Sequence, residues 1–496
     1  MFKKLLSLLL IVSMLGQAQA FCGFYVAQAD AKLFNKSSQV IIVRKDGQTV
    51  ITMSSDFEGK VEDFAMVVPV PVVIKKEQIR LARPDIFQKL DAYSGPRLVE
   101  YHDENPCYPQ PRYEMEMSAA PARSTSIEVE DDEMLDSALG VTIEEQYSIG
   151  EYDILVLSAK ESDGLEKWLK INEYKIPAGA AEVLEPYIKS QMKFFVVKVN
   201  LNEVDQKTGE TLRPIQMSFR SDKFGLPIRL GMANARGDQD MIVYAFSDQG
   251  RIETTNYRTV KVPSNRDIPT FVRDEFGDFY TSVFDRAWKR EGKKAVFLEY
   301  SWDISSSNYV KCDPCASTPP AYADLREAGV FWATNQAPQG WGGSDYQGDV
   351  FITRLHVRYN RYSFPQDLQF QVTPNKEQFQ GRYVMRNPAQ GDLKCEEAQN
   401  YLVSLVDRRE KELEELAALT GWDIAQHEDY VEKYRGMISK DRQPWLGPMD
   451  KDERNYVAPV GGHDTPQGPW GMIPWLATAV AGLGLLGLWM RRRWAV

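Results

Sequence analysis

The chain has 496 residues, with 59 basic and 70 acidic side chains and a formal net charge of −11. This acidic balance, and the lack of a basic stripe interleaved with aromatic residues, argue against nucleic-acid binding. The chain is too long for one hydrophobic core, so two or three domains are expected.

The N-terminus has the pattern of a secretory signal peptide. Lys3 and Lys4 precede an apolar run over residues 5–15, and an Ala-x-Ala cleavage pattern ends at Ala20. The apolar run is too short to cross a bilayer, which takes about 20 residues. We therefore expect residues 1–20 to be removed and the mature chain to be exported.

Residues 21–108 are predicted to form a β-rich domain. Two runs rich in β-branched residues flank Asp46-Gly47, a pair typical of a tight hairpin turn. The next apolar run, FAMVVPVPVVI, is extended. Because Pro69 and Pro71 cannot donate backbone hydrogen bonds, the sequence places this run at a sheet edge or at a kink.

Residues 109–139 are rich in proline, small and acidic residues, which indicates an acidic linker or loop.

Residues 140–375 are predicted to form a mixed α+β domain. In it, strands at 151–159 and 192–201 flank two short helices. Large apolar residues recur every three or four positions over 268–291, a pattern that predicts an amphipathic helix.

The segment VFITRLHVRYNRYSF alternates strictly between the two faces of a strand. Its polar face carries Arg354, His356 and Arg358. A cationic face of this kind can bind a carboxylate or phosphate group of a ligand, so these three residues are the candidate anion-binding set. The alternative is a solvated or salt-bridged strand face, which the abundance of acidic residues favours.

Residues 376–442 are predicted to form a helical segment with one long C-terminal helix over 395–419. Its apolar residues follow the helical period, and its other side is highly charged. Residues 443–471 are rich in proline and glycine, which is typical of a stalk.

Residues 472–490 contain no charged residue and have about the length of one hydrocarbon core, so a single C-terminal transmembrane helix is predicted. Three arginines follow, and such clusters stay on the cytoplasmic side. Residues 491–496 are therefore predicted to be a cytoplasmic tail. The expected location is an inner-membrane anchor, with the ectodomain in the periplasm or on the cell surface. Cleavage of the tail as a sorting signal stays an open alternative.

The chain has five cysteines, at Cys22, Cys107, Cys312, Cys315 and Cys395. In an oxidising compartment disulfides are the default state. Cys22 and Cys107 bracket the β-rich region and are predicted to pair. Cys312 and Cys315 are predicted to form a small-loop disulfide, or one of them is joined to Cys395.

A Cys-x-x-Cys pair can instead be a redox catalyst or half of a zinc site. A redox pair needs a helix N-terminus to lower its thiol pKa, and Pro319 and Pro320 interrupt any helix after Cys315. Zinc needs four ligands, usually in two close pairs, and no second pair is present. We therefore predict no metal, no cofactor and no catalytic residues. An exported thiol-disulfide oxidoreductase or an unrecognised hydrolase remains the alternative function.

Several long strings resemble a bacterial family named "domain of unknown function 2330". They include CGFYVAQADAKLFNKSSQVIIVR, FAMVVPVPVVI, YSWDISSSNYVKCDPCA and TRLHVRYNRYSFPQDLQFQ, and the resemblance covers roughly residues 22–375. It implies an exported protein that is often anchored at its C-terminus. It supplies no catalytic residues.

The predicted fold class is α+β, with a β-rich N-terminal domain, a mixed α/β middle region, a long C-terminal helix and a single transmembrane helix. The expected function is that of a membrane-anchored, extracytoplasmic binding or structural ectodomain. Its expected partners are the membrane, through the C-terminal helix, and a protein or envelope ligand.

Overall fold

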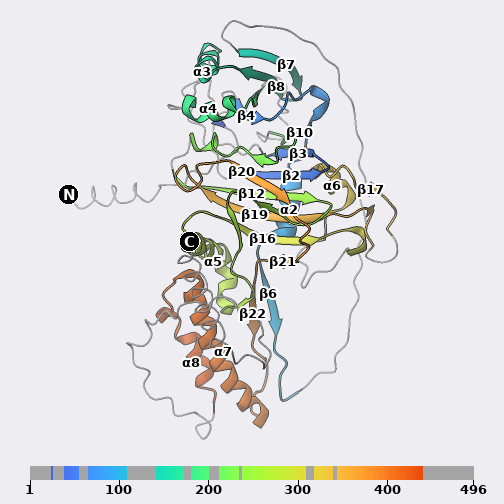
Figure 1. Cartoon of the computed structure of the whole chain (residues 1–496). Helices are drawn as coiled ribbons and strands as arrows, with labels where there is room; N and C mark the ends of the chain where they lie inside the picture. Colours follow the sequence, from blue (N-terminus) through green and yellow to red (C-terminus); the bar gives the residue numbers. More distant parts are fainter. Residues whose placement is uncertain are drawn as a thin grey trace, which may run out of the picture. The chain divides into compact units, whose positions relative to one another are not determined.

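A nine-stranded sheet is the largest sheet of the computed structural model (Figure 1). Its strand order is β14-β16-β19-β12-β2-β3-β10-β5, and β21 pairs with β16 beside this path. The strands are β2 (Ser38–Lys45), β3 (Gln48–Met53), β5 (Ile79–Leu81), β10 (Ile215–Arg220), β12 (Gln239–Ser247), β14 (Arg258–Lys261), β16 (Ala295–Asp303), β19 (Phe351–Tyr359) and β21 (Phe379–Gln380).

The structure describes residues 24–25, 38–54, 65–108, 141–172, 180–199, 212–233, 237–308, 318–338 and 343–438. All of them belong to one compact unit, which ends at Gln443. The predicted signal peptide, acidic linker, stalk, transmembrane helix and tail lie outside the described residues. Among the helices that the structure describes, none combines the length and the apolar character needed to cross a membrane.

The hairpin predicted around Asp46-Gly47 is confirmed. Residues 38–45 pair with residues 48–53 in antiparallel register. Asp46 and Gly47 have φ angles of 49° and 79°, the left-handed conformations that a tight two-residue turn requires. The hairpin lies inside the sheet, because β2 also pairs in parallel with β12 and β3 pairs with β10.

A second, five-stranded sheet has the order β1-β4-β9-β8-β7. Its strands are β1 (Phe24–Tyr25), β4 (Ala65–Val70), β7 (Val141–Ile149), β8 (Tyr152–Ala159) and β9 (Lys193–Val199). Helices α3 (Ser162–Ile171) and α4 (Ala180–Lys189) pack on one face around Leu165, Leu169 and Leu184. The other face shares the largest apolar core with the nine-stranded sheet. This strand–helix–helix–strand block agrees with the sequence prediction.

The opposite face of the nine-stranded sheet is covered by α2 (Asp85–Ser94) and α6 (Tyr322–Ala328). Small sheets complete this part of the fold, with β11 (Gly225–Leu226), β20 (Leu368–Val372) and β13 (Ile252–Thr254) in one, and β17 (Thr334–Asn335) and β18 (Tyr346–Gln347) in another. Short 3-10 helices are η2 (Lys76–Gln78), η3 (Gly231–Ala233) and η5 (Ser306–Asn308).

The C-terminal helices pack against a separate three-stranded ribbon. The ribbon has the order β15 (Arg266–Asp267), β22 (Arg382–Asn387), β6 (Arg97–His102). Around it lie η4 (Thr270–Glu275), α5 (Phe276–Arg290), α7 (Glu396–Thr420), η6 (Ala425–His427) and α8 (Asp429–Arg435). The long helix predicted over 395–419 therefore corresponds to α7, and two apolar clusters hold it in place.

The residues predicted as a β-rich N-terminal domain do not form a core of their own. Strands β2, β3 and β5 lie in the same sheet as strands from residues 215–359, and β4 lies in the same sheet as β7, β8 and β9. The predicted boundary near residue 108 therefore separates sequence segments, not folding units. The described part of the chain is a mixed α/β structure built around shared sheets.

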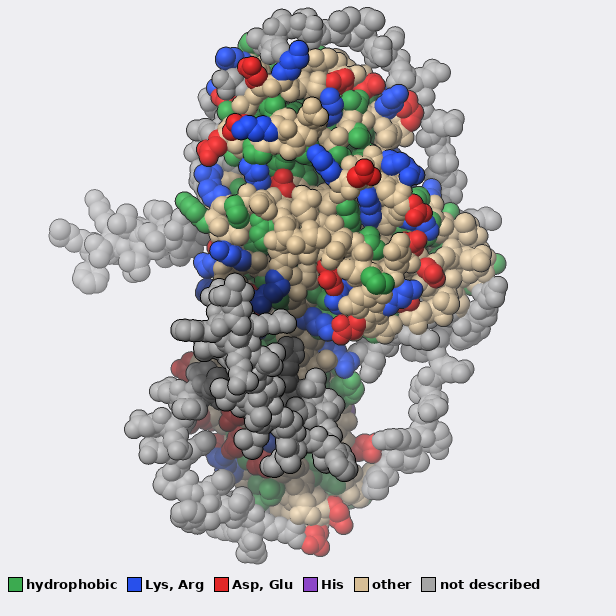
Figure 2. Space-filling model, in the orientation of Figure 1, with side chains coloured by type: hydrophobic (Ala, Val, Ile, Leu, Met, Phe, Trp, Pro, Cys, Tyr) green, Lys and Arg blue, Asp and Glu red, His purple; other side chains and the backbone are tan. Residues whose placement is uncertain are grey.

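Charged side chains on the face shown in Figure 2 are interspersed by sign. Lys and Arg side chains lie next to Asp and Glu side chains over the described surface of that view. On the described surface of this view, no single sign of charge marks a binding face.

Candidate functional site

The predicted anion-binding residues lie together on β19, and each of them contacts a carboxylate. Arg354 donates from Nε to Glu299 Oε2 at 2.6 Å and from Nη1 to Asp91 Oδ1 at 2.6 Å. Asp91 comes from α2, and Glu299 comes from the neighbouring strand β16. The Glu299 side chain is 0% exposed. A buried carboxylate thus links β16 to β19 through Arg354.

His356 has a carboxylate on each ring nitrogen. Nδ1 lies 2.7 Å from Glu299 Oε1, and Nε2 lies 3.1 Å from Asp240 Oδ1 on β12. The ring stacks on Phe284 of α5, with ring centroids 3.7 Å apart. Two acceptors on the two nitrogens favour the imidazolium form, in which both nitrogens carry a proton. Neither nitrogen is left to take a proton from a substrate.

Arg358 completes the polar face of β19. Its Nε and Nη2 donate to the two oxygens of Asp240 at 2.8 and 2.9 Å, which is a bidentate pair. The guanidinium also lies 5.0 Å from the centre of the Phe284 ring. Arg358 therefore links α5, through Phe284, to β12 and β19.

The electrostatics follow from these contacts. Burial opposes ionisation of Glu299, but the charges of His356 and Arg354 outweigh it and hold the pKa of Glu299 at about 2. In the same way, His356 and Arg358 outweigh burial and hold the pKa of Asp240 at about 2. Burial would lower the pKa of His356, but Glu299 and Asp240 raise it. The favoured state is a set of paired charges.

These contacts are those of a salt-bridged strand face, the alternative that the acidic composition favours. A ligand anion at Arg354, His356 and Arg358 would have to displace Glu299 or Asp240. Glu299 was not among the residues predicted for this site. Its signal is a single carboxylate within the apolar run AVFLEYSW, because such a residue needs a buried partner.

A pocket lies elsewhere, where the nine-stranded sheet meets two other sheets. Its floor is one face of β3 and β10, where Met217 pairs with Ile51 and Phe219 pairs with Thr49. Its walls come from the end of β4 and from β11 and β20. The lining residues are Thr49, Ile51, Met53, Val68, Pro69, Val70, Pro71, Met192, Met217, Phe219, Lys223, Gly225, Leu226, Pro227, Asp367 and Gln369.

The pocket is mainly apolar and has few polar groups. Asp367 Oδ1 accepts hydrogen bonds from the Tyr187 hydroxyl at 2.7 Å and from the backbone N–H groups of Ile228 and Arg229. Burial raises the pKa of Asp367 and outweighs these bonds. Lys223 is exposed at the rim, and its Nζ donates to the backbone oxygen of Ser190.

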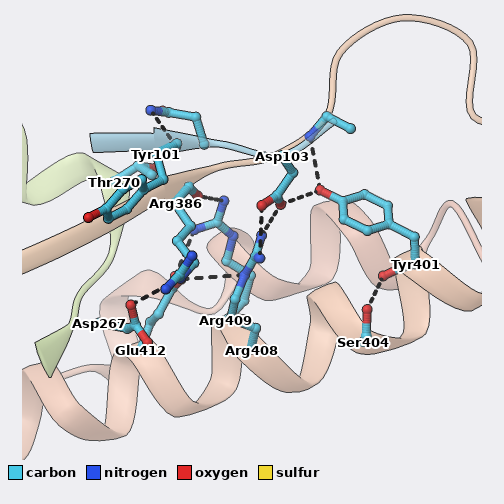
Figure 3. A network of polar contacts seen from close by, with 12 residues as sticks. Tyr101, Asp103, Asp267, Thr270, Arg386, Tyr401, Ser404, Arg408, Arg409 and Glu412 are labelled. Carbon is cyan, nitrogen blue, oxygen red and sulfur yellow. Dashed lines mark hydrogen bonds and ion pairs between the residues drawn. The ribbon is translucent and has the colours of Figure 1, made fainter. Parts of the chain in front are cut away.

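A second polar cluster holds α7 against β6 and β22 of the three-stranded ribbon (Figure 3). The Tyr401 hydroxyl donates to Asp103 at 2.7 Å, and Arg408 also contacts Asp103. Deeper in the packing, the fully buried Arg409 donates to Glu412 at 2.6 Å and to the Arg386 backbone oxygen at 3.1 Å. The contacts are internal to the fold and support the packing of α7.

Beside this cluster, Cys107 and Cys395 form a disulfide with a Cα–Cα distance of 5.8 Å across 288 residues of sequence. The predicted pairing of Cys22 with Cys107 is therefore wrong. The reason lies in the ribbon, because β6 runs parallel to β22 and so carries Cys107 to the start of α7. Cys22, Cys312 and Cys315 lie outside the described residues.

Comparison with known proteins gives one match. No curated protein and no solved structure matches the chain. A family described as "Uncharacterized protein conserved in bacteria (DUF2330)" matches residues 16–371. The match ends before β22 and α7, so the disulfide joins the matched region to a segment beyond it. The match covers well over half of the sequence, and the chain belongs to this bacterial family.

Proposed function

We propose that this protein is an exported, membrane-anchored ectodomain that acts by binding and not by catalysis. Its signal-peptide pattern and its C-terminal apolar span with three arginines support this proposal. A periplasmic or cell-surface location places it where an envelope component or another protein is accessible.

The Cys107–Cys395 disulfide is the observation that carries the proposal. Disulfides persist in oxidising compartments and are rare in the cytosol. This one joins Cys107, which follows β6 inside the matched region, to Cys395 at the start of α7, beyond that region. A link of this kind suits an ectodomain that has to stay folded without cytosolic chaperones.

The described polar clusters support binding over catalysis. A general base needs a lone pair within reach of a substrate proton, and both nitrogens of His356 already face carboxylates. Arg409 and Glu412 are likewise buried against each other. The open, mostly apolar pocket beside Lys223 is the described feature with the character of a ligand site.

Membrane topology tests the proposal. The full chain, with an epitope tag after Val496, is expressed in bacteria, and protease is added to spheroplasts before and after lysis. We expect external protease to degrade the ectodomain and to leave a small membrane-bound fragment that carries the tag. An ectodomain that survives until lysis would overturn the proposed export. Release of a mature ectodomain without the tag would overturn the permanent anchor.

A further inference from the structure

We propose that the pocket between β3, β10, β4 and β20 binds the alkyl chain of an anionic amphiphile, whose acidic head group pairs with Lys223. The inference deepens the proposed function, since the envelope is a source of such molecules. It rests on four observations that concern the wall, the size, the flexibility and the charge of the pocket.

The wall of the pocket is apolar although it opens to solvent. Ile51, Met53, Met217 and Phe219 on its floor are each at most 6% exposed, so they form part of the largest core. Pro69 and Pro71 at the end of β4, and Pro227 directly after β11, add apolar surface without backbone donors. An apolar group placed there loses contact with water and forfeits no hydrogen bond.

The size of the pocket selects a narrow group. Its cavity volume is about 80 Å³, within about 680 Å³ of space that includes the open mouth. A buried cavity that holds benzene is larger, at about 150 Å³. The end of a single alkyl chain therefore fits the enclosed part better than a ring does, and the rest of the molecule has to lie in the open mouth.

Three methionines give this wall an adaptable surface. Met53 and Met217 lie on the floor, and Met192 lies in the turn that precedes β9. Methionine side chains are unbranched and polarisable, and they are common at surfaces that accept variable apolar groups. The pocket is thus suited to chains of differing length.

The charge at the rim selects an anion. Lys223 has three N–H donors, and the structure gives its ammonium one hydrogen bond, to the Ser190 oxygen at 3.3 Å. Within the described residues no carboxylate lies within ion-pair distance of it. Asp367, the acidic residue of the wall, already accepts three hydrogen bonds at one oxygen. An acidic head group therefore finds, beside the apolar floor, a cation that has no ion pair among the described residues.

Photo-crosslinking on the full chain in membranes tests this inference. The probe is dodecanoic acid with a diazirine near its methyl end, and the matched probe is the corresponding dodecylamine. We expect peptides that contain Met53 and Met217 to be labelled about two- to five-fold more by the acid than by the amine, the effect of one exposed ion pair. Equal labelling by the two probes, or no labelling of these peptides, would overturn the inference.

Variants separate the head group from the chain. Lys223→Glu should abolish the preference for the acid, whereas Lys223→Arg should keep it. Lys411→Glu, at an exposed position of α7, is the matched control and should label like the wild type. Met217→Trp should fill the pocket and remove labelling by both probes. Retention of the acid preference in Lys223→Glu would contradict the role of Lys223.

The topology experiment and this one fail independently. An exported protein that the acid probe does not label keeps the proposed location and loses this ligand class. A protein that is labelled at the pocket but is protected from external protease keeps the ligand site and loses the proposed location.

Discussion

Glu299 shows how a buried charge is stabilised in this protein. Its carboxylate accepts from Arg354, His356 and the Tyr280 hydroxyl, so both of its oxygens are used. Removing one partner of a buried ion pair leaves the other charges unpaired in a medium of low polarity. The network therefore specifies the register of β16 against β19 and the position of α5.

The substitution Glu299→Gln tests this role. It keeps the size of the side chain and removes the negative charge, so Arg354 and His356 lose their main compensation. We expect the free energy of unfolding to fall by about 3–5 kcal/mol. Glu166→Gln is the control, because its pair with Lys170 lies on the surface of α3, and a change of less than about 0.5 kcal/mol is expected. Equal effects in chemical denaturation would refute the role of Glu299.

His356 predicts a pH dependence of stability. Its pKa is raised in the fold, so its contribution is fully present below the unfolded pKa of about 6.5 and is lost as the pH rises through the folded pKa. Glu299 and Asp240 have lowered pKa values, so their contribution to stability is present at neutral pH. It is lost only in acid, as the pH falls from about 4 towards 2.

We therefore expect the free energy of unfolding of the wild type to decrease as the pH rises above about 6.5. His356→Gln should lack this component while it retains the loss of stability in acid. Denaturation curves collected across this pH range check the expectation. A variant with the same slope as the wild type above neutral pH would show that His356 is not the titrating group.

At the scale of elements, the turn after α6 depends on glycine. Gly329 has a φ of +96°, and a Cβ built on it would lie 2.7 Å from Val50 Cγ1. Gly329→Ala is expected to lower the melting temperature, with a cost of about 1–3 kcal/mol. Gly277 in α5 has open space around it, so Gly277→Ala should be neutral or raise stability by up to about 1 kcal/mol. A Gly277→Ala variant that is less stable than the Gly329→Ala variant would contradict the described backbone.

Local patterns in the sequence predict single elements well and their partners poorly. The β2–β3 hairpin and the alternation of β19 follow from turn chemistry and a period of two. The predicted helix over 268–291 is α5 preceded by the 3-10 helix η4. The parallel pairing of β2 with β12 depends on contacts between residues about 200 positions apart, which periodicity does not report.

The candidate sites also depend on residues that are distant in sequence. The residues Arg354, His356 and Arg358 were predictable as one face of a strand, but their carboxylates come from four other elements, α2, β16, β12 and α5. The pocket depends on five strands that no single motif connects. The signal-peptide pattern predicts an oxidising compartment for the cysteines, whereas the pairing of Cys107 with Cys395 depends on the neighbouring positions of β6 and β22.

For the whole molecule, we propose that the chain folds as an extracytoplasmic protein. The C-terminal helices lie beyond the family match, yet they are bound to it by apolar clusters, by ion pairs around Asp103 and by one disulfide. The matched region and the helices that follow it are therefore packed and cross-linked into one structure, which we propose lies in an oxidising compartment.

Thiol trapping in living bacteria checks this claim. Cells that express the full chain are treated with a membrane-permeant maleimide before lysis, and peptides are mapped without reductant. The claim predicts a Cys107–Cys395 cross-linked peptide, with neither cysteine alkylated. In Cys395→Ser, Cys107 should become alkylated. A wild-type chain in which Cys107 and Cys395 both carry maleimide would contradict the claim.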